Sequence, residues 1–380
     1  YLILPDPKDL KVMQTRFDCG ELKLNKIPSQ REDLGVLEGY HSPQLEVSVR
    51  LNTNESPFPL PDAFTQEFGS AIEKLDLNRY PKRSASELCV SIADKEILKE
   101  SEVFVANGSN EVIQSICLAF GGYGRSALIF EPTYAMHSQI AKITGTRVLE
   151  GFRNSAFQVD ENLALEVIRR ERPEIVFLCS PNNPTGNTES LELIDAILFE
   201  LNSTGGLLVV DEAYKEFSDT SSELTVSEDS NLAFIRTFSK VRSLAGVRLG
   251  YLLAPEWCVN MVKTVSLPYH LDSVKQTAGI LALKYEDEMK RNLELIKKER
   301  KKVFDGLLSL PMKVWPSEAN FLLFKPESIE AYKLWQELLD EGILIRDCSS
   351  WDGLDGCLRV TIGSESENDT FLDVVRKIVK

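Results

Sequence analysis

The stretch FIRTFSKVRSLAGVRLGYLLA, from Phe234 to Ala254, is the most informative part of this sequence for its fold. Two apolar segments enclose Lys240, and the stretch contains arginines but no acidic residue. Lysine rarely enters a protein interior without a partner, because burying an unpaired charge is costly. Lys240 therefore lies either in an exposed turn or beside a partner that is not a carboxylate.

Similar apolar segments recur on both sides of this stretch, between about residues 85 and 280. The apolar runs are VFVANG, SALIFEP, EIVFLCSP, GLLVVDEA, LAFIRTFS and GYLLAP, and the segments SNEVIQSICLAF, ENLALEVIRRE and LELIDAILFEL between them have helical patterns. Strands that alternate with helices of this length predict βαβ units and a mostly parallel sheet, which is an α/β fold. Ligands bind such sheets at the carboxyl ends of the strands.

The pattern changes after about residue 280. A long charged segment, EDEMKRNLELIKKERKKVFDGLLSL, is followed by VWPSEANFLLF, a predicted helix at about 328–341, GILIRDC and CLRVTIG. This mixture of helices and strands predicts a separate, smaller α+β domain. The expected parts are an N-terminal extension (1–29), a small domain with an N-terminal arm (30–75 and 281–380) and a large domain (76–280).

Composition limits the classes of partner. The chain has 380 residues, 43% hydrophobic and 27% charged, which is ordinary globular composition. A net charge of −15 argues against nucleic acid or an anionic membrane as the main partner. No apolar run approaches the roughly 20 residues of a membrane span, and the first residues are too charged for a secretory leader.

Cysteine and histidine spacing predicts no metal site. The seven cysteines are scattered without a CxxC pair, and the three histidines, which include His137 and His270, lie far apart. Both of these histidines are expected to serve packing or support. Scattered, apolar-flanked cysteines are typical of reduced thiols, so we expect a cytoplasmic protein.

Four motifs each follow a predicted strand at its carboxyl end. They are Gly108-Ser109-Asn110-Glu111, the segment PNNPTG with Asn183, Asp211-Glu212-Ala213-Tyr214, and Ser239-Lys240. Because the carboxyl ends of parallel strands meet at one edge of a sheet, we expect the four motifs to line one cleft.

Each motif alone also has a simpler explanation. NGSNE is consistent with a helix N-cap as well as with an anion site at a helix N-terminus. PNNPTG is consistent with a turn, although Asn183 also offers an amide above the sheet edge. Asp211 is either a solvated loop residue or a buried acid that needs a cation or a strong donor.

In combination, the motifs supply what pyridoxal phosphate requires. The hydroxyls of Thr237 and Ser239 and the guanidinium of Arg248 suit a phosphate. The cofactor's aldehyde takes a lysine as a Schiff base, its ring nitrogen needs a carboxylate, and its phenolic oxygen accepts hydrogen bonds from tyrosine and asparagine. The predicted partner of Lys240 is therefore a covalent one.

The motif order resembles a known enzyme family. NGSNE, PTY, PNNPTG, DEAY, SK-x₇-R and LRVTIG, over about 107–363, resemble the fold-type-I, class I/II aminotransferases, which depend on pyridoxal phosphate. The stretches VRLNTNESPFPLP, NRYP, SLAGVRLGY, LPYHLDSVKQ and GILIRD…GCLRVTIGSESEN resemble, more narrowly, the histidinol-phosphate aminotransferases over about 32–380. The resemblance implies a fold-type-I transferase with a large cofactor-binding domain.

The resemblance also implies roles for individual residues. Lys240 forms the Schiff base with the cofactor and moves the substrate Cα proton. Asp211 keeps the ring nitrogen protonated, which makes the ring an electron sink. Tyr214 and Asn183 bind the phenolic oxygen, and Tyr134 lies against the ring. The residues implied to hold the phosphate are Ser109, Asn110, Thr237, Ser239 and Arg248.

Further implied residues bind the substrates or the neighbouring subunit. Arg359 grips the substrate α-carboxylate, although an exposed arginine on a strand is the alternative from spacing alone. Arg346 and Tyr40 match positions near the side-chain phosphate of the substrate. Tyr80, in NRYP, reaches the cofactor phosphate of the neighbouring subunit, which implies a homodimer.

The implied reaction is a ping-pong transamination between L-histidinol phosphate and 2-oxoglutarate, giving imidazole-acetol phosphate and glutamate in histidine biosynthesis. Its catalytic lysine should have a lowered pKa, because it must be neutral for part of the cycle. Three alternatives remain: an aromatic-amino-acid aminotransferase, a threonine-phosphate decarboxylase and a non-catalytic cofactor-binding regulator. The last normally carries a DNA-binding module, for which the extension at 1–29 is too short and the chain too acidic.

Overall fold

The computed structural model describes residues 28–35, 43–219 and 225–379. The chain divides into two units, residues 1–38 and residues 39–380. In the first unit, the described part contains a short 3₁₀ helix, Glu32–Leu34. Most of the predicted extension at 1–29 lies outside the described residues, and so does Tyr40.

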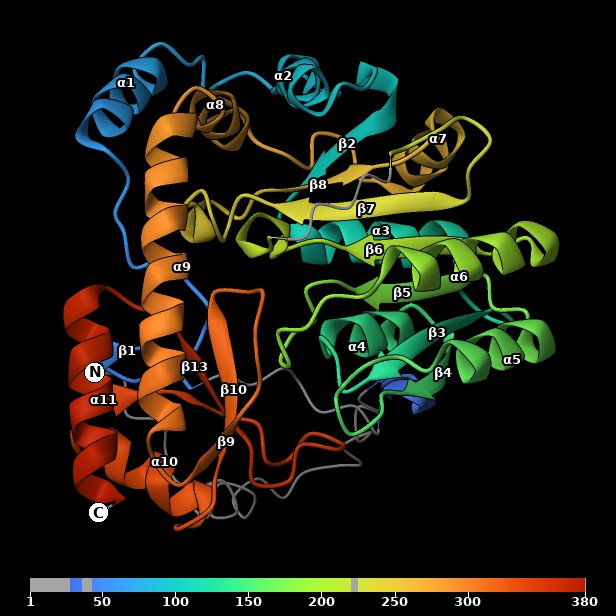
Figure 1. Cartoon of the computed structure of the whole chain (residues 1–380). Coiled ribbons are helices and arrows are strands. Elements are labelled where there is room, and N and C mark those ends of the chain that lie inside the picture. Colours follow the sequence, from blue (N-terminus) through green and yellow to red (C-terminus); the bar gives the residue numbers. More distant parts are fainter. Residues whose placement is uncertain (1–27, 36–42, 220–224, 380) are drawn as a thin grey trace, which may run out of the picture. The chain divides into compact units, whose positions relative to one another are not determined.

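A seven-stranded sheet forms the centre of the larger part of residues 39–380 (Figure 1). Five neighbouring strands of this sheet, β7, β6, β5, β3 and β4, run parallel to one another. Strand β8 runs antiparallel to both of its neighbours, β7 and β2. The mostly parallel sheet predicted from the sequence is therefore confirmed. In spatial order the strands are β2 (Val103–Ala106), β8 (Gly250–Leu253), β7 (Leu232–Thr237), β6 (Leu207–Asp211), β5 (Ile175–Cys179), β3 (Ser126–Glu131) and β4 (Arg147–Phe152).

Helices cover both faces of this sheet, which explains why its central strands are continuous apolar runs. Alternate strand residues pack into two separate cores, one on each face. One face carries α3 (Ser109–Phe120), α4 (Met136–Ile143) and α7 (Glu256–Val265). The other carries α1 (Asp62–Ile72), α2 (Ser86–Glu96), α5 (Glu161–Glu171), α6 (Leu191–Thr204) and α8 (Ser273–Ala282).

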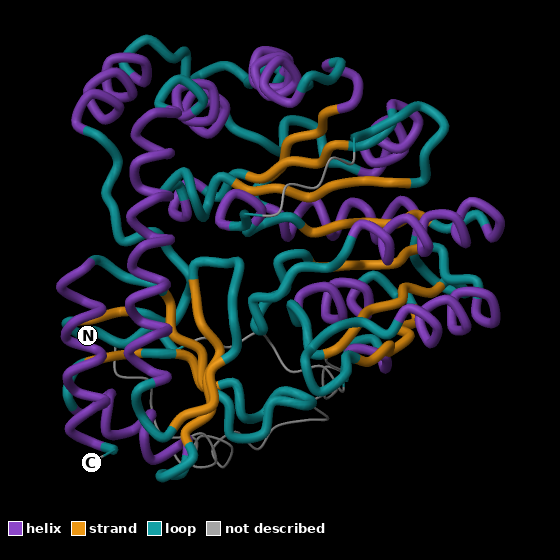
Figure 2. The backbone as a smooth tube through the Cα atoms, in the orientation of Figure 1, coloured by secondary structure: helices purple, strands orange, loops and turns teal. Residues whose placement is uncertain are grey.

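The C-terminal part has its own core around an antiparallel sheet (Figure 2). That sheet has the order β12 (Arg346–Asp347), β13 (Leu358–Thr361), β10 (Phe321–Pro326) and β9 (Met312–Val314). The helices that pack with it are α9 (Glu286–Leu308), α10 (Ala331–Asp340) and α11 (Glu365–Ile378). The three remaining described 3₁₀ helices are Glu100–Glu102, Lys215–Phe217 and Ala245–Val247.

A short strand pair brings the segment around residue 50 to this C-terminal part. Strand β1 (Val49–Arg50) pairs in parallel with β11 (Ile343–Leu344), and the next residue, Leu51, lies in the same core. The segment that follows β1 is thereby held beside the small sheet.

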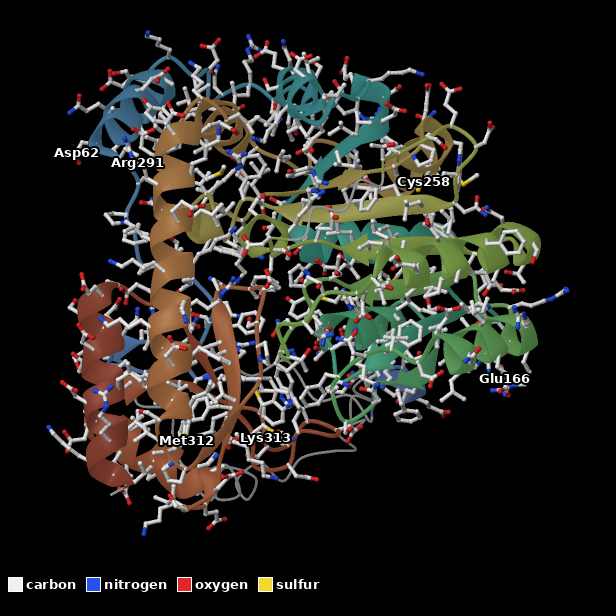
Figure 3. The ribbon with its side chains drawn as sticks, viewed as in Figure 1. Asp62, Glu166, Cys258, Arg291, Met312 and Lys313 are labelled. Atoms are coloured by element: carbon white, nitrogen blue, oxygen red, sulfur yellow. The ribbon has the colours of Figure 1, made fainter. Side chains whose placement is uncertain are left out.

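The predicted domain boundaries remain a prediction. The separate core of the C-terminal part supports two domains, but Phe64 of α1, expected in the small domain, packs in the core of the large sheet. The six described cysteines are buried and unpaired, among them Cys258 on α7, which Figure 3 labels. Among the described residues, no helix is both long and apolar enough to span a bilayer.

Candidate active site

One pocket collects the ends of the central strands and the start of α3. Its unfilled volume, including the open mouth, is about 900 Å³. Twelve of the fourteen predicted site residues line it, so the four motifs do share one cleft. They are Ser109, Asn110, Tyr134, Asn183, Asp211, Tyr214, Thr237, Ser239, Lys240, Arg248, Arg346 and Arg359.

The two other predicted residues are not in this pocket. Tyr40 is outside the described residues. Tyr80 is 81% exposed and stacks on Tyr269, with 4.5 Å between the ring centroids.

Lys240 follows β7 and is held by backbone oxygens rather than by an acid. Its Nζ donates to the carbonyl oxygens of Thr53, at 3.2 Å, and Asn54, at 3.0 Å. Burial, with a further contribution from the positive charge of Arg359, lowers the pKa of Lys240 to about 7, so a fraction of the Lys240 side chains is neutral at neutral pH. Lys240 therefore does not lie in an exposed turn, and the partners of its amine are not carboxylates.

Asp211 is the last residue of β6 and only 2% exposed, so it is not a solvated loop residue. Its Oδ2 lies 2.9 Å from Nε2 of His137, and its Oδ1 accepts a hydrogen bond from the Ala213 backbone at 3.1 Å. His137 is fully buried on α4, stacked on Phe177 at 4.9 Å. A buried carboxylate held by two donors is fixed in orientation and can meet a cationic ring nitrogen.

His137 therefore supports Asp211 directly, and support was one of the two roles expected for this histidine. Its Nδ1 has no hydrogen-bond partner among the described residues. Since Nε2 faces a carboxylate, Nε2 carries the hydrogen and donates. The sequence signal is weak, because YAMHSQ only indicates a histidine near the start of a helix.

The start of α3 has the features of an anion site. Gly108 is the N-cap and has a φ of +83°, and no side chain caps this helix end, so the N-cap explanation of NGSNE is wrong for its serine and asparagine. A Cβ on Gly108 would lie 2.7 Å from Nη2 of Arg248. The glycine therefore lets the Arg248 guanidinium approach the backbone N–H groups at the positive end of the helix dipole.

Hydroxyl groups complete this anion site at the start of α3, which we call the phosphate cradle. Nη1 of Arg248 donates to Oγ of Ser239 at 3.4 Å, and the Ser239 backbone N–H donates to Oγ1 of Thr237 at 3.1 Å. The Tyr134 hydroxyl donates to Oδ1 of Asn110 at 3.0 Å. Hydroxyls, helix N–H groups and one guanidinium form a set of donors that suits a phosphate.

Arg359 on β13 is 5% exposed, so the alternative of an exposed strand arginine is wrong. Its Nη1 donates to Oδ1 of Asn183 at 2.6 Å, and its Nη2 donates to the carbonyl oxygen of Asn52 at 2.8 Å. Arg359 Nε and the side-chain oxygen of Asn52 are buried without a hydrogen-bond partner among the described residues. Unsatisfied buried polar atoms on a pocket wall indicate where a polar ligand would bind.

Tyr214 is 4% exposed, and its hydroxyl oxygen accepts a hydrogen bond from Nδ2 of Asn54 at 3.0 Å. Burial raises the pKa of Tyr214, and the nearby charge of Arg359 only partly offsets this. The phenol therefore stays protonated and is a hydrogen-bond donor at neutral pH.

Arg346 lies opposite Arg359 across the β12–β13 pair, and both line the pocket. The Arg346 guanidinium lies 5.5 Å from the ring centroid of Trp351. The pocket lining contains four cationic side chains, Lys240, Arg248, Arg346 and Arg359, but one carboxylate, Asp211. In a chain of net charge −15, this local excess of positive charge points to anionic ligands.

The sequence-based prediction missed several lining residues. Asn52, Thr53, Asn54 and Trp351 all reach the pocket. The first three lie in VRLNTNESPFPLP, which carries part of the family resemblance, but their place beside the pocket depends on the distant pairing of β1 with β11. The phosphate cradle, the buried Asp211 and Lys240 together fit pyridoxal phosphate, which offers an anion, a basic ring nitrogen and an aldehyde.

Comparison with known proteins agrees with this chemistry. The model of the family "Aminotransferase class I and II" matches residues 46–375. A histidinol-phosphate aminotransferase of Corynebacterium glutamicum (strain R) is 42% identical over 371 aligned residues, and the match covers 95% of this chain and 99% of that protein.

Two solved structures are similar over most of the chain. The histidinol-phosphate aminotransferase from Clostridium acetobutylicum has a TM-score of 0.80 at 27% identity, covering 87% of this chain and 98% of that one. The histidinol-phosphate aminotransferase from Sinorhizobium meliloti, in complex with pyridoxal-5'-phosphate, shares the fold with a TM-score of 0.80 at 22% identity, covering 88% and 92% of the two chains. This chain therefore belongs to the class I and II aminotransferases and is a pyridoxal-phosphate-dependent enzyme of the histidinol-phosphate aminotransferase family.

Proposed function

We propose that the protein exchanges an amino group between L-histidinol phosphate and 2-oxoglutarate, giving imidazole-acetol phosphate and glutamate in histidine biosynthesis. The observation that carries this proposal is the pair of arginines, Arg346 and Arg359, which lie opposite each other on β12 and β13 inside one pocket. Both substrates are anions that must occupy the same pocket in turn. One is a phosphate ester and the other is a dicarboxylate, and guanidinium groups bind both.

In this proposal the two arginines bind different anionic groups. Arg359 takes the α-carboxylate of glutamate or 2-oxoglutarate, and its position beside Asn183 fixes the direction of its guanidinium. Arg346 lies near the phosphate of histidinol phosphate. Tyr40 is proposed for the same phosphate on the resemblance alone.

Bound pyridoxal phosphate supplies a ring that stabilises the negative charge that develops when the substrate Cα loses its proton. Lys240 provides the amine that binds the cofactor aldehyde and later takes the Cα proton. A lysine with a pKa of about 7 can do this, because a useful fraction is neutral at physiological pH. The carboxylate of Asp211, fixed by His137, keeps a proton on the ring nitrogen.

The remaining pocket residues orient the cofactor. Tyr214 and Asn183 would bind the phenolic oxygen of the cofactor, and Tyr134 would lie against its ring. The phosphate would be held by Ser109, Asn110, Thr237, Ser239 and Arg248, which all line the pocket.

We also propose that the enzyme is a homodimer in the cytoplasm. Tyr80 does not line its own pocket, and it is exposed and stacks on Tyr269, which is also exposed. A second copy that covers this surface would bring its own Tyr80 to the cofactor phosphate. The buried, unpaired cysteines are consistent with a reducing compartment.

A steady-state assay of glutamate formation from 2-oxoglutarate tests the proposed substrate. We expect kcat/KM for L-histidinol phosphate to exceed the value for phenylalanine by at least about tenfold, since an extra charge-assisted hydrogen bond contributes about 1.5–3 kcal/mol. Arg346→Ala should remove most of that preference, and Arg346→Lys should restore part of it. Faster turnover of phenylalanine would indicate an aromatic-amino-acid aminotransferase, and carbon dioxide release from phosphothreonine would indicate the decarboxylase.

A further inference from the structure

Asn54 is a buried residue that lines the pocket, and no role was expected for it from the sequence. It is 1% exposed, follows β1, and has a φ of +54°, in the left-handed region. Asparagine tolerates this conformation better than most residues with a side chain. Its backbone and side chain together contact Lys240, Tyr214, Thr361 and Asn320.

The hydrogen bonds between Asn54 and Thr361 fix the orientation of the Asn54 amide. The Asn54 backbone N–H donates to Oγ1 of Thr361 at 3.0 Å, and the Thr361 hydroxyl donates to Oδ1 of Asn54 at 3.0 Å. If the positions of Oδ1 and Nδ2 of Asn54 were exchanged, the Thr361 hydroxyl would face two N–H donors. Its own hydrogen would then have lost Oδ1 as an acceptor. The nitrogen Nδ2 is therefore the atom that faces Tyr214.

This orientation determines where the Tyr214 hydrogen points. Nδ2 of Asn54 donates to the Tyr214 oxygen at 3.0 Å, so the phenol must give its own hydrogen to a different acceptor. Tyr214 lines the pocket, and its raised pKa keeps that hydrogen in place at neutral pH. The hydroxyl is thereby set to donate into the pocket.

The backbone of the same residue orients Lys240. Its carbonyl oxygen and that of Thr53 accept the hydrogen bonds from Nζ, at 3.0 and 3.2 Å. A neutral amine has two hydrogens and one lone pair, so two carbonyl acceptors leave the lone pair directed elsewhere. Asn320 donates to the Asn54 carbonyl oxygen at 3.2 Å and helps to hold this peptide in place.

We propose that Asn54 is a positioning residue that directs the Tyr214 hydrogen and the Lys240 lone pair toward the reacting atoms. The left-handed backbone of Asn54 lets its carbonyl oxygen accept a hydrogen bond from Lys240. The Asn54 amide, fixed by Thr361, donates to the Tyr214 oxygen and so determines where the hydroxyl hydrogen points. This inference rests on the roles proposed above for Lys240 and Tyr214.

Three substitutions and one control separate the parts of this arrangement. Asn54→Gly adopts the left-handed backbone and keeps both carbonyl oxygens, but it removes the amide. Asn54→Asp keeps the shape but places a carboxylate that accepts, rather than donates, beside Tyr214. Thr361→Val removes the hydroxyl that fixes the amide, and Thr361→Ser is its matched control because it keeps that hydroxyl.

In the holoenzyme we expect Asn54→Gly to lower kcat at least about tenfold, the effect of one lost hydrogen bond at the site, with a smaller change in KM. The pH titration of the visible absorbance band should move upward, since a misdirected Tyr214 hydrogen no longer stabilises the deprotonated cofactor. Thr361→Val should reproduce both changes, and Thr361→Ser should largely reverse them. Melting temperatures of all variants identify any that have merely failed to fold.

A second readout does not depend on activity. In the full-length chain without cofactor, the pH dependence of Lys240 acetylation, followed by mass spectrometry, reports the lysine pKa. The charged groups that act on this amine are Arg359, Glu55, Arg248 and Asp211. An added carboxylate in Asn54→Asp should raise the midpoint above about 7, and Asn54→Gly should leave it nearly unchanged.

Folded Asn54→Gly and Thr361→Val enzymes with unchanged kcat and unchanged absorbance titration would overturn the proposal. So would an unchanged acetylation midpoint in Asn54→Asp. Wild-type enzyme that fails to transaminate L-histidinol phosphate would instead refute the proposed substrate. The pH titrations of Lys240 acetylation and of the visible absorbance band would still test the role of Asn54.

Discussion

At the residue scale, the unusual feature is a lysine whose hydrogen-bond partners are two backbone carbonyl oxygens, those of Thr53 and Asn54. A buried cationic amine without a carboxylate is costly, and the lowered pKa is the physical response. The same environment that makes Lys240 a poor ion makes it a usable base. Asp211 shows the opposite solution, because a buried carboxylate is kept in place by donors from His137 and a backbone N–H.

Substitution of Lys240 should abolish transamination. We expect Lys240→Ala to lose at least about a thousandfold in kcat, because both the covalent attachment of the cofactor and the base are removed. Lys240→Arg is the matched control, since it keeps the positive charge but supplies no amine that is neutral near pH 7. Near-normal turnover by either variant would contradict the role proposed for Lys240.

The pH dependence of kcat should follow the same lysine. Its pKa is lowered from the usual 10.5 to about 7, so the neutral base is abundant above pH 7 and becomes scarce below it. We therefore expect kcat to fall as pH drops through about 7, measured with saturating substrates in buffers of constant ionic strength. A profile that is flat across this range would mean that another group, or no proton transfer, limits the rate.

Substitution of Asp211 tests the carboxylate. Asp211→Asn preserves the size of the side chain and should leave a folded protein that still binds the cofactor. The amide cannot keep a proton on the ring nitrogen, so kcat should fall by at least about a hundredfold. Full activity of this variant would show that the ring nitrogen does not need the carboxylate.

At the scale of elements, the strand ends explain why the motifs meet. Motifs at the ends of β5, β6 and β7 and at the start of α3 could be placed in one cleft from the sequence, because a parallel sheet has one carboxyl edge. The contribution of Asn54 could not, because it depends on the pairing of β1 with β11 across the chain. For the same reason, burial of Arg359 was undecided, since an LRVTIG strand reads alike whether its arginine faces solvent or a pocket.

The close approach of α3 to Arg248 gives a prediction at this scale. In Gly108→Ala, the new Cβ would lie 2.7 Å from Arg248 Nη2, so the guanidinium must move and the affinity for pyridoxal phosphate should fall. Gly124→Ala is the matched control, because Gly124 also has a positive φ, +78°, but nothing within 4 Å of the added Cβ. The dissociation constant of the cofactor, measured by fluorescence titration, should rise in the first variant only. Equal effects in both would show that backbone strain, and not the cradle, is responsible.

At the scale of the whole molecule, two features bear on function: the distribution of charge and the exposed position of Tyr80. The chain carries a net charge of −15, yet the pocket concentrates four cationic side chains. In the proposed function, local guanidinium groups bind anionic substrates against the field of the protein as a whole. Tyr80 lies outside its own pocket, so the proposed site is complete when a second copy of the chain supplies it.

The proposed dimer predicts that Tyr80 acts in trans. Tyr80→Phe should weaken cofactor binding several-fold, because one hydroxyl donor to the phosphate is lost. Tyr123→Phe, at another fully exposed tyrosine, is the control. Mixing inactive Lys240→Ala chains with Tyr80→Phe chains should restore one complete site in each mixed dimer, and sedimentation should give the mass of two chains. A fully active monomer would contradict the proposal.

The most direct test of the central claim is the absorbance of the purified holoenzyme during each half-reaction. Adding L-histidinol phosphate alone should remove the visible band of the lysine-bound cofactor, and adding 2-oxoglutarate should restore it, with one imidazole-acetol phosphate and one glutamate formed per site. A visible band that ignores L-histidinol phosphate, while responding to another amino donor, would contradict the proposed substrate. The absence of any band with pyridoxal phosphate would contradict the role of Lys240 itself.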